Sequence, residues 1–359
     1  MGLVKNTIRA GREFARLICL SCICYVGLSA CATSGAPLDN QRLKPEVALQ
    51  DMRVISVPFE QGRNGLLYVE MDINGERTAP FIVDTGATRT AIYKDLAKQV
   101  TSLPSEQEDE IHVYGLDGVG RHNIITLPHL KLAELLVEKT DVIILETPPH
   151  NINGLAAEGI LGLDILSNYR LLLDSKMKML HLIPHQISPL DLSEWFYVPL
   201  SENPYRDGYE NLRFAEMRIA GKVTPALIDT GSEFTFINWK AADFSQVRRL
   251  RQRLKESWVI QGSVGEFRPT SRVRISSLRA GQKFWSNEDF IITDFESLDV
   301  LGANTEPFLV VGMNLLGDRD IYIDFANKEL RIKPGQDDLE RAANYGKVFT
   351  TSGTAATPQ

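Results

Sequence analysis

The chain contains one pattern twice, and this duplication limits its fold more than any other feature. Phe81–Ala87 reads Phe-Ile-Val-Asp-Thr-Gly-Ala, and about 145 positions later Ala226–Ser232 reads Ala-Leu-Ile-Asp-Thr-Gly-Ser. The surrounding segments recur at nearly the same spacing: Tyr68–Gly75 with Phe214–Gly221, and Ile160–Leu166 with Val310–Leu316. A chance match of a three-residue motif does not repeat its neighbours, so the spacing indicates two copies of one structural unit.

Short apolar runs bounded by turn residues predict that each copy is built from β-strands. In each copy an alternating segment, a turn that contains glycine and the motif segment form a predicted β-hairpin. Each copy also ends in a predicted strand pair, over 171–174 with 179–184 and over 321–324 with 330–334. Apolar residues make up 43% of the chain, enough for two cores, so we expect an all-β fold with two duplicated lobes.

A glycine follows two aliphatic residues late in each copy, at Gly162 and Gly312. A residue without Cβ allows two backbone segments to approach closely, so we expect these glycines to lie close to another part of the motif loops. The alternative is a glycine in an ordinary β-turn.

The two Asp-Thr-Gly motifs and the two later glycines resemble the pattern of aspartic proteases of the pepsin and retropepsin clan. The resemblance covers residues from about 65 to 334. It implies two retropepsin-like β-barrel lobes with the active site between them, and Asp84 and Asp229 as the catalytic pair, one from each lobe. It also implies that no metal or organic cofactor is needed. Each lobe is short, like a retropepsin subunit, so the chain is expected to act as a monomer with tandem lobes.

The resemblance implies supporting roles for the residues that follow the two aspartates. Thr85 and Thr230 would brace the loops through hydroxyl bonds to the backbone of the opposite loop. Gly86 and Gly231 would permit the turn that the family makes at this point.

Ser232 marks a difference between the two motifs. Its hydroxyl could bond the Asp229 carboxylate, whereas Ala87, at the same place in the first motif, has no hydroxyl to offer Asp84. A hydrogen bond to the charged form favours ionisation. Asp229 is therefore expected to be the more readily ionised member of the pair.

Two glycine-containing segments occupy the position where the family carries hairpins that close over substrate. They are Gly115–Gly120 in the first copy, predicted as a hairpin tip, and Gln261–Gly265 in the second. The residues that could face a substrate there are Tyr114, Leu116, Gln261 and Ser263. A plain solvent-exposed hairpin is the alternative.

The N-terminal segment resembles a bacterial lipoprotein signal. Basic residues precede an apolar stretch, Leu17–Ala30, that is too short to span a bilayer as a helix, and Leu-Ser-Ala-Cys ends at Cys31. The resemblance implies cleavage before Cys31, lipid on this residue and sorting to an outer membrane, facing the periplasm. An ordinary secretory signal is the alternative. The other three cysteines lie in the signal, so the mature part is expected to have no disulfide and no Cys-based metal site.

These features predict five segments along the chain. They are a signal peptide over 1–30, a lipidated cysteine and flexible tether over 31–50, an N-terminal lobe over 51–190, a C-terminal lobe over 191–335, and a tail over 336–359.

The charge balance argues against a nucleic-acid partner. The formal net charge is −7, and removal of the basic signal segment brings it to −10. One basic segment, 247–255, is an exception: it predicts an amphipathic helix with Val247, Leu250, Leu254 and Trp258 on one face. Its basic side would be solvated or would contact an anionic lipid or cell-wall polymer.

Because both motifs are intact, the sequence predicts an aspartic endopeptidase that acts on polypeptide segments of envelope or secreted proteins. The alternatives are a catalytically silent envelope lipoprotein that binds peptides or proteins with the same fold, and a structural spacer. The six histidines show no metal-ligand spacing, so no metal site is expected.

Overall fold

The computed structural model describes residues 53–100, 110–115, 118–146, 156–207, 209, 211–255, 259–262, 266–269, 271–294 and 297–338. It also places the backbone of three short strands nearer the N-terminus: β1 (Leu17–Cys19), β2 (Cys24–Tyr25) and β3 (Glu46–Val47). Cys31, most of the predicted signal and tether, and the chain after Asp338 lie outside the described residues.

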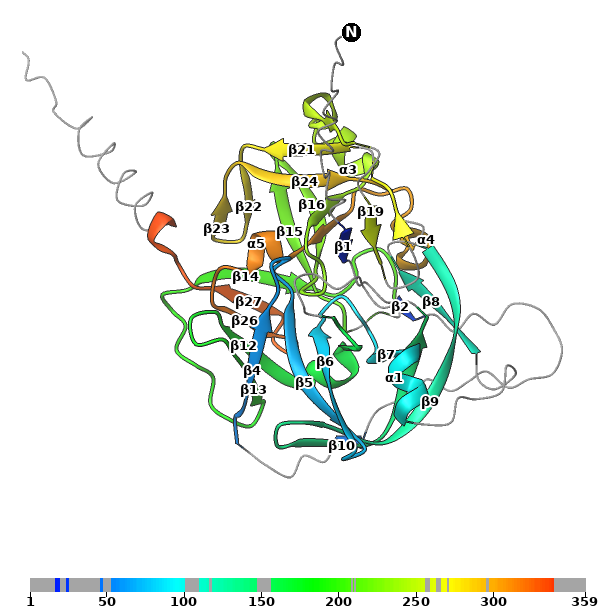
Figure 1. The fold of residues 1–359 in the computed structure, drawn as a ribbon. Helices are drawn as coiled ribbons and strands as arrows, with labels where there is room; N and C mark the ends of the chain where they lie inside the picture. Colours follow the sequence, from blue (N-terminus) through cyan, green and yellow to red (C-terminus); the bar gives the residue numbers. More distant parts are fainter. Residues whose placement is uncertain are drawn as a thin grey trace, which may run out of the picture.

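The first lobe is a barrel of strands with two short helices (Figure 1). Around the barrel the neighbours are β4, β5, β6, β11, β7, β10 and β9, and β9 pairs back with β5. The elements of this lobe are β4 (Ile55–Gln61), β5 (Leu67–Ile73), β6 (Arg77–Val83), β7 (Ala91–Tyr93), α1 (Lys94–Val100), β8 (Glu110–Gly115), β9 (Gly118–Leu132), β10 (Leu135–Leu145), β11 (Gly159–Leu161), α2 (Leu163–Leu166), β12 (Tyr169–Asp174) and β13 (Met179–Pro184).

The second lobe repeats this order of elements. Its strands are paired in the sequence β14, β15, β16, β25, β17, β24 and β21, and β22 pairs back with β15. The elements are β14 (Phe196–Ser201), β15 (Phe214–Ile219), β16 (Lys222–Ile228), β17 (Thr235–Ile237), α3 (Trp239–Phe244), the 3-10 turn η2 (Arg248–Leu250), β18 (Gln252–Arg253), β19 (Val259–Gln261), β20 (Glu266–Phe267), β21 (Ser271–Ile275), β22 (Leu278–Ala280), β23 (Lys283–Trp285), β24 (Glu288–Ile292), α4 (Leu298–Leu301), β25 (Leu309–Val311), α5 (Met313–Leu316), β26 (Ile321–Asp324) and β27 (Glu329–Ile332). The all-β fold with two duplicated lobes, predicted from the repeat, is confirmed.

The hairpins that lead into the two motifs have the same turn chemistry. Asn74 and Gly75 are the first two residues of the three-residue connection between β5 and β6, with φ angles of 58° and 71°. Ala220 and Gly221 form the two-residue connection between β15 and β16, with φ angles of 46° and 81°. Two successive residues with positive φ match the right-handed twist of the flanking strands, which is why such turns make tight hairpins. The turns thereby set the register in which β6 and β16 reach the motifs.

One six-stranded sheet is shared by the two lobes. Its order is β4, β13, β12, β26, β27 and β14, with three strands from each lobe. The join is antiparallel pairing of β12 with β26, centred on Leu172 opposite Tyr322. Figure 1 shows this sheet on one side of the molecule, with β5 and β6 of the first lobe and β15 and β16 of the second lobe extending from it in opposite directions. Main-chain hydrogen bonds thus hold the lobes in one relative position.

The hydrophobic core lies entirely between Ile55 and Ile332 among the described residues. It includes the first and last strands of the shared sheet as well as both barrels. The part of the chain from residue 51 onward therefore contains the packing that an independent fold needs.

The predicted basic helix is wrong. Helix α3 is followed by Gln246, whose φ of 61° ends the helical path, and by the single turn η2; from Arg251 the chain is extended and continues into β18. Leu250, predicted on a buried helical face, is 54% exposed, whereas Leu254 is buried. Trp258 lies outside the described residues. Pairing of β18 with β21 competes with helix formation and prevails here.

The third residue of the predicted tail, Asp338, is packed against the second lobe. Asp338 forms an ion pair with Lys283 on β23, with Nζ–Oδ1 and Nζ–Oδ2 distances of 2.7 and 2.8 Å. Both side chains are nearly buried, 4% and 6% exposed, and the Lys283 ammonium lies over the rings of Phe196 and Trp285. The ordered fold therefore extends at least to Asp338.

We expect Asp338→Ala to destabilise the protein by about 3–5 kcal/mol, because it leaves a buried lysine charge without its partner. The neighbouring Asp337 pairs with Arg319 but is 50% exposed, so Asp337→Ala should cost about 1 kcal/mol or less. Urea unfolding of residues 51–359 measures both. Equal, small losses in the two variants would contradict a stabilising role for the buried pair.

Candidate active site

The two Asp-Thr-Gly loops begin where a motif strand ends. Asp84 follows β6 and Asp229 follows β16, and each motif strand is paired in parallel with a late strand of its own lobe, β11 or β25. This parallel pairing continues into the loops, because the N–H of Asp84 donates to the Leu161 carbonyl (3.1 Å) and that of Asp229 to the Val311 carbonyl (3.0 Å). Each aspartate is thus positioned by two strands that are distant in sequence.

The two loops are joined by reciprocal threonine hydrogen bonds. The Thr85 hydroxyl donates to the Ile228 carbonyl (2.8 Å) and accepts the N–H of Thr230 (3.1 Å). The Thr230 hydroxyl donates to the Val83 carbonyl (2.7 Å) and accepts the N–H of Thr85 (3.1 Å). All four bonds cross between lobes and are buried, so they are not weakened by exchange with water. The cross-loop bonding expected from the resemblance is present.

Each aspartate packs against the glycine of the opposite loop. A Cβ added to Gly86 would lie 2.5 Å from Cγ of Asp229, and one added to Gly231 would lie 2.2 Å from Cγ of Asp84. Any side chain at either glycine would therefore displace a carboxyl group. Both aspartates are fully buried, and the structure brings their carboxyl groups together across the lobe boundary.

The loop backbone orients each carboxyl group. Oδ1 of Asp84 accepts the N–H groups of Gly86 (2.8 Å) and Ala87 (2.9 Å). Oδ1 of Asp229 accepts the N–H of Gly231 at 2.9 Å. Hydrogen bonds of this kind hold the side chain in one rotamer, which a pair of facing carboxyl groups requires.

The prediction that Ser232 bonds the Asp229 carboxylate is wrong. The Ser232 hydroxyl donates to the Phe234 carbonyl at 2.7 Å, within its own loop. A hydroxyl carries one proton, so this bond uses the donor that the sequence assigned to the Asp229 carboxylate. The difference between Ala87 and Ser232 therefore gives no reason to expect Asp229 to ionise more readily than Asp84.

The later glycines lie directly against the motif loops. A Cβ on Gly162 would be 2.4 Å from the carbonyl carbon of Arg89, and one on Gly312 would be 2.3 Å from the Phe234 carbonyl oxygen. The Gly162 N–H donates to the Thr90 hydroxyl (3.1 Å), and the Gly312 N–H donates to that of Thr235 (3.2 Å). Close backbone approach explains why a residue without Cβ occupies each position.

The two threonines form part of a second layer that the sequence analysis missed. Thr90 donates its hydroxyl proton to Oδ1 of Asp164 and Thr235 donates to Oδ1 of Asn314, both at 2.7 Å. The signal was present in the repeat, because each threonine follows its motif aspartate by the same interval and each partner follows its glycine by two residues. The layer links the motif loop to helix α2 or α5.

The two lobes differ at one position of this second layer, where the first lobe has the titratable Asp164 and the second has Asn314. Burial raises the pKa of the Asp164 carboxyl group, and the hydrogen bonds from Thr90 only partly oppose this rise. Its counterpart in the second lobe, Asn314, accepts the same threonine bond without titrating. An amide oxygen is therefore sufficient for the structural role of this position.

The two glycine-containing segments are hairpins, as predicted. β8 pairs with β9 up to Gly115 opposite Gly118, and β19 pairs with β20 through Gln261 opposite Glu266. Tyr114 is buried on β8, whereas Leu116, Ser263 and the side chain of Gln261 lie outside the described residues. The structure therefore does not place those side chains relative to the aspartates.

Both hairpins pair with strands from the N-terminal region. β2 runs antiparallel to β8, with Cys24 opposite Tyr114, and β1 runs parallel to β19, with Leu17 opposite Val259 (Figure 1). The open edges of β8 and β19 thus accept extended backbone, one edge in each lobe. Among the described residues, no group of three or more His, Cys, Asp or Glu side chains is arranged to hold a metal ion.

Comparison with known proteins places one family match in each lobe. Residues 69–168 match the family described as "gag-polyprotein putative aspartyl protease", and residues 215–315 match the family described as "Aspartyl protease". The crystal structure of an aspartic proteinase from Irpex lacteus superimposes with a TM-score of 0.50 at 13% identity, over 80% of this chain and 98% of that one. A search of curated proteins finds no match.

The contrast between Asp164 and Asn314 predicts a pH effect on stability. A carboxyl group whose pKa is raised by folding binds its proton more tightly in the folded state, so its contribution to stability falls as the pH rises above its unfolded pKa, near 3.8. Asp164→Asn removes this loss. We expect the Tm of Asp164→Asn minus the Tm of wild type to increase as the pH rises from about 4 to 7. Each kcal/mol of relative stability corresponds to a difference on the order of 2–4 °C in Tm.

The reciprocal variant is the control for this prediction. Asn314→Asp introduces the titrating group into the second lobe, so its Tm relative to wild type should fall over the same pH range. Thermal unfolding of residues 51–359, followed by circular dichroism, measures both trends. Profiles that stay parallel to wild type at every pH would show that Asp164 does not carry the raised pKa.

Proposed function

We propose that this chain, which carries an aspartyl protease domain in each lobe, is an active endopeptidase with Asp84 and Asp229 as its catalytic pair. The observation that supports this most is the reciprocal bonding of Thr85 and Thr230, which brings one carboxyl group from each lobe against the opposite loop. A protein that only binds peptides has no need for two buried acids held face to face.

The chemistry follows from the proximity of the two acids. Two carboxyl groups held against each other cannot both ionise at low cost, so one keeps a proton. The ionised carboxylate takes a proton from a water molecule, whose oxygen attacks the scissile carbonyl carbon, while the protonated carboxyl group donates to the carbonyl oxygen. The carboxyl group that took the water proton then donates it to the amide nitrogen, the other carboxylate takes a proton from a hydroxyl of the tetrahedral intermediate, and the C–N bond breaks. This releases an amine and a carboxylic acid and restores the starting protonation of the pair. No bond forms between enzyme and substrate, and no step requires a metal or cofactor.

The proposed substrate is an extended segment of polypeptide. Pairing of β2 with β8 and of β1 with β19 supports this. Both N-terminal strands lie before Cys31 and would be removed with the signal, but their pairing indicates that one strand edge in each lobe accepts extended backbone. Strand addition uses main-chain hydrogen bonds and is tolerant of sequence. Proteins that are unfolded or have long exposed loops would therefore be cut in preference to compact ones.

We also propose that the active unit is a monomer. Both aspartates belong to one chain, and the shared sheet holds their lobes together through β12 and β26. A homodimer obtains the same pairing of two loops only by association. Cleavage per molecule should then be the same at every enzyme concentration.

We expect Asp84→Asn and Asp229→Asn each to lower cleavage of unfolded casein by roughly a hundred- to ten-thousand-fold, the range for loss of a general acid or base. The double variant should be little worse than either single variant, since the two groups act as one unit. Residues 51–359 are incubated with the substrate, and new peptide termini are quantified by mass spectrometry.

The control for this test is Asp318→Asn, which removes an exposed carboxyl group near α5. It should cleave like wild type and exclude a general effect of charge. Near-normal cleavage by either catalytic-site variant would reject the two-carboxylate mechanism. Equal, low cleavage by all proteins, wild type included, would favour a binding protein.

We propose that the protein is a lipoprotein of the bacterial envelope, anchored in the outer membrane through lipid on Cys31 and facing the periplasm. Within the described residues, no helix is both long and apolar enough to cross a membrane. The proposal rests on the basic and apolar pattern before Cys31 and on the Leu-Ser-Ala-Cys sequence. Envelope and secreted proteins would then be the substrates within reach.

We expect Cys31→Ala to lose incorporation of labelled palmitate when the full chain is expressed in a diderm bacterium, because the acceptor sulfur is gone. Cys24→Ala, within the predicted signal, should keep the label and serves as the matched control. Labelling is the primary readout, since membrane fractionation also reports non-covalent contacts. Undiminished labelling of Cys31→Ala would reject this anchor.

A further inference from the structure

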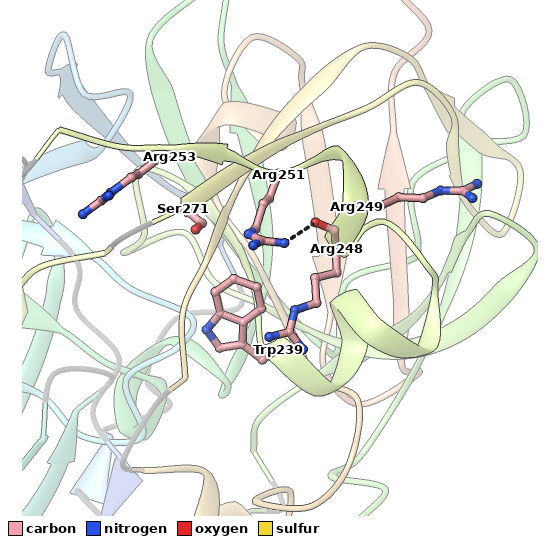
Figure 2. Close-up of a pocket in the computed structure, with 6 residues that line it drawn as sticks. All are labelled: Trp239, Arg248, Arg249, Arg251, Arg253 and Ser271. Carbon is pink, nitrogen blue, oxygen red and sulfur yellow. Dashed lines mark hydrogen bonds between the residues drawn. The ribbon is translucent and has the colours of Figure 1, made fainter.

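The segment after helix α3 forms a basic surface that the proposed protease chemistry does not use. Residues 248–255 contain five basic residues and no acidic one, in a chain whose formal net charge is −7. The segment borders a pocket of about 750 Å³, whose lining residues are Trp239, Arg248, Arg249, Arg251, Arg253 and Ser271 (Figure 2). We call the exposed stretch Arg248–Arg253 the arginine face.

The arginine face lies at the end of the second lobe. Its strand β18 pairs with β21, and Figure 1 shows β21 and α3 on the side of this lobe opposite the shared sheet. Arg272 of β21 lies opposite Gln252 in this pairing and adds another exposed cation. The surface is therefore distant from the join between the lobes and free of their packing.

Acidic neighbours neutralise only part of this charge. Arg248 is held by both carboxylate oxygens of Asp243 and lies over the ring of Trp239, 4.9 Å from its centre. Neither Arg249 nor Arg251 forms an ion pair with any described residue, and Arg251 donates only to the Arg248 carbonyl at 3.4 Å. Two exposed guanidinium groups thus remain for an external anion.

The arrangement of the arginines indicates what kind of anion fits. Figure 2 shows Arg249 and Arg253 extending to opposite sides, with Arg251 and Trp239 between them. Guanidinium groups that converge can enclose a single phosphate, whereas groups that diverge contact separate anions. The arginine face is therefore suited to a surface or polymer with many negative charges.

An exposed apolar residue favours a lipid surface over a soluble polyanion as the partner of the arginine face. Leu250 lies between Arg249 and Arg251 and is 54% exposed, and Phe244 at the end of α3 is 43% exposed. A soluble polyanion gains nothing from a leucine among the arginines. A lipid surface does, because the apolar side chain enters the headgroup boundary while the basic groups bind phosphates.

We propose that the arginine face docks the second lobe on a membrane that contains anionic phospholipid. Leu250 enters the interface, Arg249 and Arg251 contact headgroup phosphates, and Asp243 with Trp239 holds Arg248 in position. The net negative charge of the rest of the protein is repelled by the same surface, so the contact also orients the molecule. This inference does not depend on whether the protein cleaves peptides.

The test uses the absence of cysteine from residues 51–359. Leu250→Cys is labelled with an environment-sensitive fluorophore and mixed with vesicles of phosphatidylcholine, alone or with phosphatidylglycerol. Emission should rise and shift to the blue only with phosphatidylglycerol. A label at Leu136→Cys, an exposed leucine on β10 of the first lobe, should not respond.

Charge variants test the arginines directly. Arg249→Gln with Arg251→Gln, in the Leu250→Cys background, should raise the vesicle concentration for half-maximal response on the order of tenfold to thirtyfold, from about 1 kcal/mol per basic residue. Arg63→Gln with Arg279→Gln removes the same charge from exposed positions elsewhere and should change the response far less. Added salt should weaken the wild-type response.

Three outcomes would overturn the proposal. They are no response at position 250 with phosphatidylglycerol, an equal response at positions 250 and 136, and an equal effect of the two pairs of charge variants. Inorganic polyphosphate tests the remaining alternative, which is that the arginine face binds a soluble polyanion. If the unlabelled protein binds polyphosphate but does not float with phosphatidylglycerol vesicles, the arginine face recognises a soluble polyanion and the lipid proposal fails.

Discussion

The reciprocal hydrogen bonds of Thr85 and Thr230 are the contact on which the geometry of the site depends. Each hydroxyl accepts an N–H from the opposite loop and donates to a carbonyl of the opposite motif strand. Loss of one hydroxyl would leave two buried backbone groups without partners, which costs more than the hydrogen bonds themselves contribute. The positions of the two carboxyl groups are therefore set by the relation between lobes, and the shared sheet makes that relation rigid.

The parts of the fold that the sequence predicted are those with a local cause. Alternating burial and a turn at Asn74 and Gly75 are sufficient to specify a hairpin, and the second copy repeated the signal independently. The close approach at Gly162 was predictable for a similar reason, because a glycine after two buried aliphatic residues has few other uses. Duplication strengthened each of these inferences, since every element could be read twice.

The parts that the sequence did not predict depend on competition between partners. The sequence suggested the Asp229 carboxylate as the acceptor for the Ser232 hydroxyl, and only the folded loop shows that the Phe234 carbonyl is the acceptor used. Residues 247–255 had helical periodicity, but a strand partner on β21 was available and local propensity was overridden. The ion pair of Lys283 with Asp338 joins two residues that belong to no common sequence pattern, so it could not be predicted from the sequence.

The shared sheet has a consequence for the order in which the protein acquires structure. The edge of β12 at Leu172 meets its partner Tyr322 only about 150 residues later in the chain, and β4 and β14 lie at opposite ends of the same sheet. During synthesis the first lobe therefore has an open, apolar strand edge that no neighbour covers. The loop that contains Asp229 and the last strands are synthesised after the first lobe. A nascent chain of this length therefore contains Asp84 but not the aspartate that pairs with it. Under the proposed function, the catalytic pair is therefore incomplete until the second lobe has emerged, and the topology itself delays cleavage of the chain's own unfolded segments.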